Sequence, residues 1–155
     1  MLNNVIIRKY KPEDAQQCSS LMQDHFRNDA INLPELVRKS IADARTAEYV
    51  ISISKDRTLA VAELNNKIIG MGGLKGNEVR HIYVNRKFHK KKIGSAILNF
   101  LGEEAMKKGL FSIIVNSVFY AMDFYLKNGF TYLQHTQIER HGSVIEAILL
   151  EKQLK

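Results

Sequence analysis

A run of basic residues lies between a segment that reads as a strand and one that reads as a long helix. Residues 82–98 are Ile-Tyr-Val-Asn-Arg-Lys-Phe-His-Lys-Lys-Lys-Ile-Gly-Ser-Ala-Ile-Leu, and they contain the densest basic stretch of the chain. The first turn of a helix has N–H groups without intrahelical partners and carries the positive end of the helix dipole. Gly94 and Ser95 keep the side chains small there, and Lys90, Lys91 and Lys92 add positive charge. The pattern predicts a binding site for a diphosphate ligand.

Two other interpretations of the basic run remain open at this point. The simpler one is a solvated loop followed by a helix start. The other is a nucleic-acid surface, since the chain has 23 Lys and Arg against 16 Asp and Glu, a net charge of +7 and a pI near 9.5. Basic charge favours polyanions in general. We do not expect nucleic acid as a partner, because no recognition-helix, zinc-finger or RNA-platform pattern accompanies the run.

Apolar periodicity indicates the elements that position this segment. Strands are expected over residues 5–10, 58–64, 67–74, 78–84, 111–116, 131–138 and 144–150. Helices are expected over residues 12–26, from residue 34, over 93–105 and over 118–127. Residues 46–55 fit either a strand or a helix. The pairs Asn65-Asn66 and Gly76-Asn77 have the residue types of tight turns and predict an antiparallel meander over residues 58–84.

The order of these elements predicts the class of fold. The strand, helix and strand within residues 78–116 need a crossover connection, so the sheet must contain a parallel pair. We therefore expect an α/β fold with a mixed, mostly antiparallel sheet of about seven strands and helices on both faces. A length of 155 residues suits a single domain over residues 1–155. Ligands in such sheets bind at the carboxyl ends of strands, where the sheet divides.

Several segments of the chain resemble the GNAT family of N-acetyltransferases. Residues 82–98 are similar to the family's acetyl-CoA motif, Q/R-x-x-G-x-G/A after a strand; His89 stands where Gln or Arg is usual, Lys92 where the first Gly is usual, and Gly94 at the second Gly. A later segment, residues 114–130, matches the family pattern at Ala121, Phe124, Tyr125, Gly129 and Phe130. Residues 6–14 and 60–70 also resemble the family, so the resemblance spans most of the chain.

The resemblance implies a GNAT-like acyl-CoA N-acyltransferase fold and an acyltransferase activity. An acetyl group would pass from acetyl-CoA to a primary amine of a small molecule or peptide by direct attack, with no enzyme nucleophile. The strand at residues 82–84 would bind the pantetheine arm, the N–H groups of residues 90–95 the pyrophosphate, and Asn116 would lie where two strands splay apart. The implied cofactor-binding residues are Ile82, Tyr83, Val84, His89, Lys90, Lys91, Lys92, Ile93, Gly94, Ser95 and Asn116.

Two catalytic roles follow from the same resemblance. Tyr125 would lie by the thioester sulfur and donate a proton to the departing thiolate. The attacking amine must be neutral, and Glu78, or His81 through a water, is the candidate base. Against these roles, Tyr125 lies at helical spacing with Ala121 and suits a core position, and Glu78 suits a surface strand position.

Lys92 departs most from the family pattern. We expect the lysine to be tolerated, because backbone angles in a first helical turn need not be positive. Since His89 and Lys92 alter two of three anchors, an alternative is a non-catalytic acyl-CoA-binding sensor module of the same fold. A basic nucleic-acid-binding protein is the remaining alternative, and strongly salt-dependent affinity would identify it.

The rest of the sequence mainly excludes classes of protein. The histidines lack metal-ligand spacing, so we expect no metal, and the single cysteine, Cys18, is expected to be a buried apolar residue. No signal peptide or membrane span is recognisable, so we expect a cytoplasmic protein without membrane partners. The cluster Gly70, Gly72 and Gly73 indicates a bulge or close packing.

The acceptor is the least readable part of the function. The family resemblance places its side of the molecule against the first two helices and the turn at residues 138–144. Arg140 and His141 in that turn would favour an acidic acceptor. Family habit also suggests a homodimer.

Overall fold

A computed structural model describes residues 2–155, and its sheet has seven strands in the order β1-β2-β3-β4-β5-β7-β6. Only the β4–β5 pair is parallel; every other neighbouring pair is antiparallel. The mixed, mostly antiparallel sheet that the sequence predicts is therefore confirmed. The strands are β1 (Ile6–Lys9), β2 (Thr58–Leu64), β3 (Lys67–Lys75), β4 (Glu78–Val84), β5 (Ser112–Ser117), β6 (Thr131–Arg140) and β7 (Ser143–Gln153).

Within residues 2–155, five α-helices connect these strands. They are α1 (Ala15–Asn28), α2 (Glu35–Ala44), α3 (Ala47–Ser54), α4 (Ile93–Lys107) and α5 (Met122–Lys127). Short 3-10 turns, at Pro12–Asp14 and Phe119–Ala121, precede α1 and α5. The segment that fitted either a strand or a helix forms α3, which Thr46 caps by accepting a hydrogen bond from the Tyr49 N–H at 3.1 Å. A capping threonine satisfies one of the free donors of a helix N-terminus.

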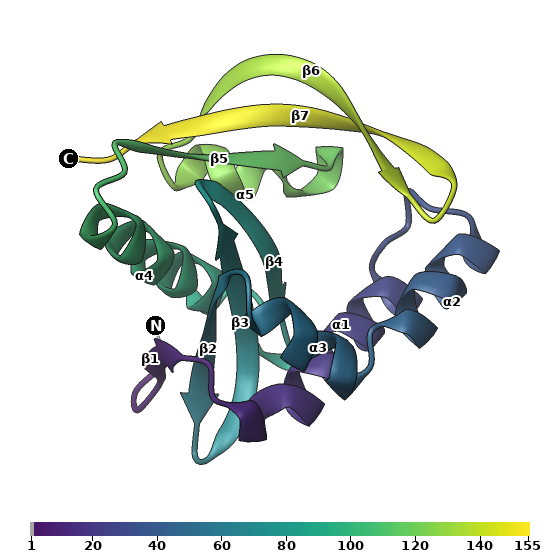
Figure 1. The fold of residues 1–155 in the computed structure, drawn as a ribbon, viewed down its shortest axis with the longest axis horizontal. Helices are drawn as coiled ribbons and strands as arrows, with labels where there is room; N and C mark the ends of the chain where they lie inside the picture. Colours follow the sequence, from purple (N-terminus) through teal and green to yellow (C-terminus); the bar gives the residue numbers. More distant parts are fainter. Residues whose placement is uncertain (1) are drawn as a thin grey trace.

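Helices cover both faces of the sheet, as expected (Figure 1). On one face, α4 packs against β2, β3 and β4 in the largest of three apolar clusters within residues 2–155. On the other face, α1 and α3 pack against β2 and β3, with Cys18 fully buried among them. A Cβ on Gly72 would lie 2.6 Å from Ile97 Cγ2 of α4. The close packing indicated by the glycine cluster is therefore present, because only a strand without side chains there lets α4 approach β3 so closely.

The sheet opens between its two central strands. The β4–β5 ladder has a single register pair, Glu78 with Ile114, at the beginning of both strands. Beyond this pair the strands splay apart, and Figure 1 shows β5, β7 and β6 leading away from β2, β3 and β4. The cleft-facing edge of β4 after Glu78 is consequently not paired with β5. A split of this kind at the carboxyl ends of parallel strands is a common place for a ligand.

The β6–β7 hairpin reaches across the opening to α2 (Figure 1). Its turn residue His141 contacts Ser40 of α2, with Nδ1 and Oγ 3.0 Å apart. Beneath this contact, a third apolar cluster joins Phe26 and Ile41 of the helices to Ile145 of β7. The hairpin and the first helices thus enclose one side of the opening. Across residues 2–155, none of the helices has the length and apolar content that crossing a membrane requires.

Candidate functional site

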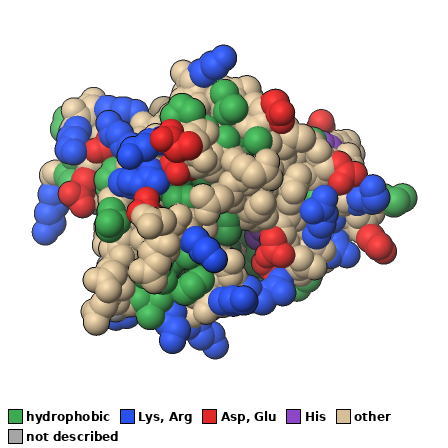
Figure 2. Space-filling view, turned by 90° about the horizontal axis from the view of Figure 1, so that it is seen from below, with side chains coloured by type: hydrophobic (Ala, Val, Ile, Leu, Met, Phe, Trp, Pro, Cys, Tyr) green, Lys and Arg blue, Asp and Glu red, His purple; other side chains and the backbone are tan. Residues whose placement is uncertain are grey.

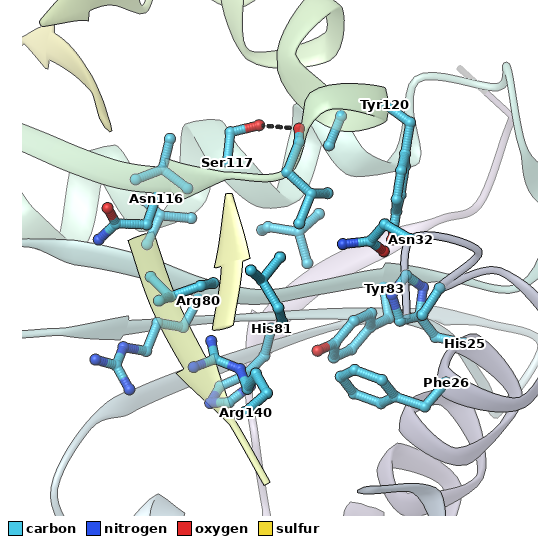
Figure 3. Close-up of a pocket in the computed structure, with 18 of the residues that line it drawn as sticks. His25, Phe26, Asn32, Arg80, His81, Tyr83, Asn116, Ser117, Tyr120 and Arg140 are labelled. Carbon is cyan, nitrogen blue, oxygen red and sulfur yellow. Dashed lines mark hydrogen bonds between the residues drawn. The ribbon is translucent and has the colours of Figure 1, made fainter. Parts of the chain in front are cut away.

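A cavity of about 350 Å³ occupies the opening between β4 and β5. Six of the residues predicted for catalysis or cofactor binding line it together: Glu78, His81, Ile82, Tyr83, Asn116 and Tyr125. Figure 3 shows Asn116 and Ser117 on the β5 side and His81 and Tyr83 on the β4 side. The end of α1, the loop after it, and strands β6 and β7 form the remaining walls. The cavity is large enough for a small ligand.

Tyr125 is both a core residue and a wall of this cavity. Its side chain is 7% exposed and packs edge-on against Phe124 and Phe130, at centroid distances of 5.0 and 5.4 Å. Its hydroxyl makes no hydrogen bond to any residue in 2–155. Burial, reinforced by the neighbouring Tyr83 phenol, raises the pKa of Tyr125 well above its usual value. The phenol is therefore protonated throughout the physiological range and is a hydrogen-bond donor toward the cavity.

Glu78 of β4 and Asn116 of β5 contact each other at the end of the opening where the two strands are still paired. The Asn116 amide donates to Glu78 Oε2 at 3.3 Å, and Arg80 donates to Glu78 Oε1 at 3.0 Å. Thr136 of β6 donates to the amide oxygen of Asn116 at 3.1 Å. Both oxygens of the carboxylate and both ends of the amide are thus engaged. Glu78 is half-buried in the cavity wall rather than on an open strand surface.

A bulge in β4 holds His81 in an unusual conformation. Met71 pairs with Tyr83 and Gly73 with Arg80, so β4 has one more residue than β3 over this interval. His81 takes a φ of +61° there, a conformation uncommon for residues other than glycine. Its Nε2 lies 3.0 Å from Arg57 Nη1. Because a guanidinium only donates, Nε2 is the acceptor and the proton is on Nδ1.

The electrostatic environment keeps His81 neutral. Burial, together with the charges of Arg57, Arg45, Arg80 and Arg140, lowers the pKa of His81 to about 3. An imidazole whose lone pair is already engaged by Arg57 is a poor proton acceptor at neutral pH. The geometry therefore argues against His81 as the base.

The loop before α4 presents a row of free backbone donors. Among residues 2–155, no hydrogen-bond partner is found for the N–H groups of residues 90–95. Lys90 and Lys92 have φ values of +61° and +64°. Alternation of left-handed and right-handed residues turns successive N–H groups toward one concavity, which is an anion-binding arrangement. The loop thus fits the pyrophosphate of the expected cofactor.

The conformation of Lys92 corrects one expectation. The sequence-based prediction was that this residue need not adopt a positive φ, but it is left-handed, at φ 64° and ψ 19°. The reason is its position. Lys92 is the N-cap of α4, where the chain reverses from the loop into the helix, rather than a residue of the first helical turn. A glycine would adopt this conformation without steric cost.

The side chains of other predicted residues in this loop, or their small size, stabilise the loop itself. A Cβ on Gly94 would lie 3.1 Å from two atoms of the Phe124 ring, so the small residue is needed for contact with α5 as well as at the loop. His89 Nε2 lies 2.8 Å from the carbonyl oxygen of Val84 and ties the loop to the end of β4. The Ile93 side chain is 1% exposed and belongs to the core. Only backbone atoms of Ile93 are available to a ligand.

The cavity also contains residues that sequence reasoning did not select. They come mainly from the segments with no recognisable pattern: His25, Phe26, Asn32, Arg45, Tyr49, Arg80 and Tyr120. Burial lowers the pKa of His25, and the charges of Asp29 and Asp24 offset part of this effect. No periodicity or spacing marks Arg45 or Arg80 as cavity residues: Arg45 follows α2, and Arg80 shares its strand with the cavity residues Glu78 and His81.

Basic and acidic side chains are mixed on the face of the molecule that Figure 2 shows. Several lysines and arginines are paired with carboxylates, for example Arg86 with Asp29 and Lys39 with Asp43. Within residues 2–155, no group of three or more His, Cys, Asp or Glu side chains is arranged to hold a metal ion.

Comparison with known proteins identifies a family and a common fold. The sequence profile described as Acetyltransferase (GNAT) domain matches residues 9–147. A search of curated proteins finds no significant match. Among solved structures, a GCN5-related N-acetyltransferase from Rhodopseudomonas palustris superimposes with a TM-score of 0.87 at 21% identity, covering 99% of this chain and 98% of that one.

Two further structures have the same architecture. The PaiA N-acetyltransferase from Thermoplasma acidophilum, solved in complex with coenzyme A, has a TM-score of 0.76 at 23% identity, covering 96% of this chain and 98% of that one. An N-acetyltransferase from Staphylococcus aureus Mu50 has a TM-score of 0.76 at 20% identity, covering 99% and 100%. At these identities the likeness concerns the fold.

Proposed function

Since the chain belongs to the GNAT acetyltransferase family, we propose that it transfers an acetyl group from acetyl-CoA to a primary amine held in the β4–β5 opening. The observation that carries the proposal is a buried phenol, Tyr125, in a cavity where two central strands diverge. The free donors of residues 90–95 support binding of the pyrophosphate, and the unpaired edge of β4 at Ile82, Tyr83 and Val84 supports binding of the pantetheine arm. The CoA complex of the Thermoplasma protein agrees with this choice of cofactor.

When bound, acetyl-CoA supplies the acetyl carbon as a thioester, whose C–S bond breaks as the amine N–C bond forms, giving an amide and the CoA thiol. We assign Tyr125 the role of donor to the departing sulfur. Its raised pKa keeps the hydroxyl proton in place at all physiological pH values. A phenol of this kind stabilises the developing thiolate by hydrogen bonding, and full transfer of its proton is not required, because the proton that the amine loses balances the one that the CoA thiol gains.

The amine must lose its proton, and we propose two contributions. The cavity is lined by three arginines, Arg45, Arg80 and Arg140. Neighbouring positive charge disfavours the ammonium form of a bound amine, so part of the substrate binds neutral. Glu78 is the remaining candidate base and lines the same cavity. It must release a hydrogen bond from Arg80 or Asn116 to act.

Thiol release from acetyl-CoA in the presence of amines tests the reaction. We expect Tyr125→Phe to lower kcat by about 100-fold or more, in line with the usual contribution of a general acid. Binding of acetyl-CoA should be nearly kept, so a saturating cofactor should raise the unfolding midpoint of both proteins by roughly 5–11 °C. Tyr132→Phe is the matched control, because Tyr132 is 58% exposed on β6 and lies outside the cavity.

The result that would contradict this role is an unchanged kcat for Tyr125→Phe with a substrate that the wild-type protein turns over. The sensor alternative predicts a midpoint rise with acetyl-CoA and no thiol release with any amine. The control variant Tyr132→Phe should keep both the kcat and the midpoint rise of the wild-type protein.

A further inference from the structure

Three arginines from separate parts of the chain meet in the wall of one cavity. Arg45 follows α2, Arg80 is in β4, and Arg140 ends β6. Figure 3 shows Arg80 and Arg140 on the same side of the pocket as His81. Glu78 is the only carboxylate that lines the cavity within residues 2–155. The lining therefore carries an excess of two positive charges, counting its histidines as neutral.

Two of the three guanidinium groups have no carboxylate partner among residues 2–155. Arg80 pairs with Glu78 at 3.0 Å. Arg140 donates only to the carbonyl oxygen of its neighbour Glu139, at 3.2 Å. Guanidinium groups that line a cavity without a carboxylate partner suit a ligand that brings acceptor oxygens.

Arg45 is held in place by aromatic rings. Its guanidinium carbon lies 4.4 Å from the centroid of Tyr49 and 5.6 Å from that of Phe26. Stacking on two rings leaves the edge of a guanidinium plane free, and that edge matches the two oxygens of a carboxylate. A side chain fixed in this way loses little conformational entropy on binding. Arg45 is thus prepared for an anion rather than mobile in solvent.

We propose that the acceptor is a small primary amine that carries a carboxylate, and that Arg45 and Arg140 bind this carboxylate. The inference rests on the proposed acetyl transfer and names the substrate class of the same site. A cavity of about 350 Å³ suits a small molecule. The same positive charges disfavour diamines and polyamines, because a second ammonium group would approach them. A carboxylate at one end fixes the position of the amine at the other.

Thiol release with matched acceptors tests the proposal. The panel contains α-amino acids and ω-amino acids of three to six carbons, their carboxamides, 1,4-diaminobutane and O-phosphoethanolamine. We expect kcat/KM for the best carboxylate to exceed that of its carboxamide by about 100-fold, the scale of a desolvated charged hydrogen-bond pair. Equal rates with the carboxamide, or a preference for the diamine or the phosphate ester, would overturn the assignment.

Variants identify the residues that bind the carboxylate. Arg140→Met and Arg45→Met should raise KM for the carboxylate by about 10-fold to 100-fold with a smaller change in kcat. They should also lower kcat/KM for the carboxamide, by a clearly smaller factor, because each variant removes positive charge that favours the neutral amine. Arg27→Met is the control, because it removes the same charge from an exposed pair with Asp43 outside the cavity. Since Arg45 also packs on aromatic rings, Arg140→Met decides the outcome if Arg45→Met does not fold. An equal loss with both kinds of acceptor would refute the proposal.

A binding measurement separates this proposal from the proposed reaction. Glutarate, which has no amine, should raise the unfolding midpoint of the CoA-saturated wild-type and Arg27→Met proteins, and glutaramide should not. The rise should be absent in Arg140→Met. An arginine-dependent rise without thiol release from any amine would refute the reaction and keep the ligand assignment. Thiol release from neutral amines without a glutarate effect would keep the reaction and overturn the assignment, and the absence of both effects would overturn both.

Discussion

Replacing Lys92 by glycine should stabilise the protein, although Lys92 lies in the expected cofactor loop. Its φ of +64° and ψ of +19° are in the left-handed region, where an L-residue pays roughly 1–2 kcal/mol. Glycine avoids this cost but loses about 0.5–1 kcal/mol through its greater freedom in the unfolded chain. The side chain is exposed, so little packing is lost. We expect Lys92→Gly to exceed wild type in stability by about 0.5 kcal/mol.

Comparison with alanine separates backbone strain from charge. Lys92→Ala removes the same charge and keeps the strain, so the glycine variant should be the more stable of the two by about 0.5–1 kcal/mol, or roughly 1–4 °C in unfolding midpoint. Lys91 provides the matched control, because it has no positive φ in the same loop. At Lys91 the order should reverse, with glycine less stable than alanine by about 0.5–1 kcal/mol.

Urea unfolding of the four variants at pH 7, with thermal melts alongside, measures these differences. The reasoning is wrong if glycine is no more stable than alanine at position 92, or if glycine has the same effect at both positions. Lys92→Gly and Lys92→Ala should also lose the same electrostatic attraction for CoA. A difference in their CoA affinity would therefore report the conformation of the loop.

Two further predictions concern the free energy of unfolding. His81 has a pKa of about 3 in the folded protein, against 6.5 for an unperturbed histidine, so the unfolded chain binds the extra proton and stability falls as pH drops below 6.5. Asparagine tolerates the positive φ of this position, so His81→Asn removes the titrating group without new backbone strain. Between pH 7 and pH 5, the free energy of unfolding measured in urea titrations should fall by about 1–2 kcal/mol less for His81→Asn than for wild type. Parallel pH profiles of the two proteins would disprove the low pKa of His81. Gly72→Ala should destabilise by about 1–3 kcal/mol because its Cβ would lie 2.6 Å from Ile97 Cγ2. Gly102→Ala, whose Cβ would meet only a Leu154 carbon at 3.7 Å, should instead stabilise α4 by up to about 1 kcal/mol; denaturant midpoints that move in the same direction would show that the close contact is relieved in some other way.

Sequence reasoning predicted the elements whose local signals are strong. The alternation of strands β2, β3 and β4 and the turn at Asn65-Asn66 were confirmed, with both asparagines at positive φ. Helix α4 was recognised from its apolar stripe, and its core residues are buried. Residues 46–55 could not be decided, because eight helical residues with a capping threonine resemble a short apolar strand.

The candidate site was predicted less completely. The cavity brings together Glu78, Asn116 and Tyr125, which are far apart in the chain and were selected through a family resemblance. Arg45 was not selected, and its role depends on Tyr49 and Phe26 stacking around it. The conformation of Lys92 was predicted wrongly, because a residue type does not reveal whether it lies at the N-cap or inside the first turn.

The sequence by itself therefore determined the order of strands and helices, the fold class and the basic loop before α4, since each depends on interactions within a few residues. The opening between β4 and β5 was expected only through the family resemblance, and only the tertiary structure decided its walls, the bulge at His81 and the meeting of Arg45, Arg80 and Arg140. These features depend on where the β6–β7 hairpin and α1–α3 lie relative to the sheet. That placement results from packing among residues distant in sequence, and the local helix and strand propensities of a segment carry no information about such packing.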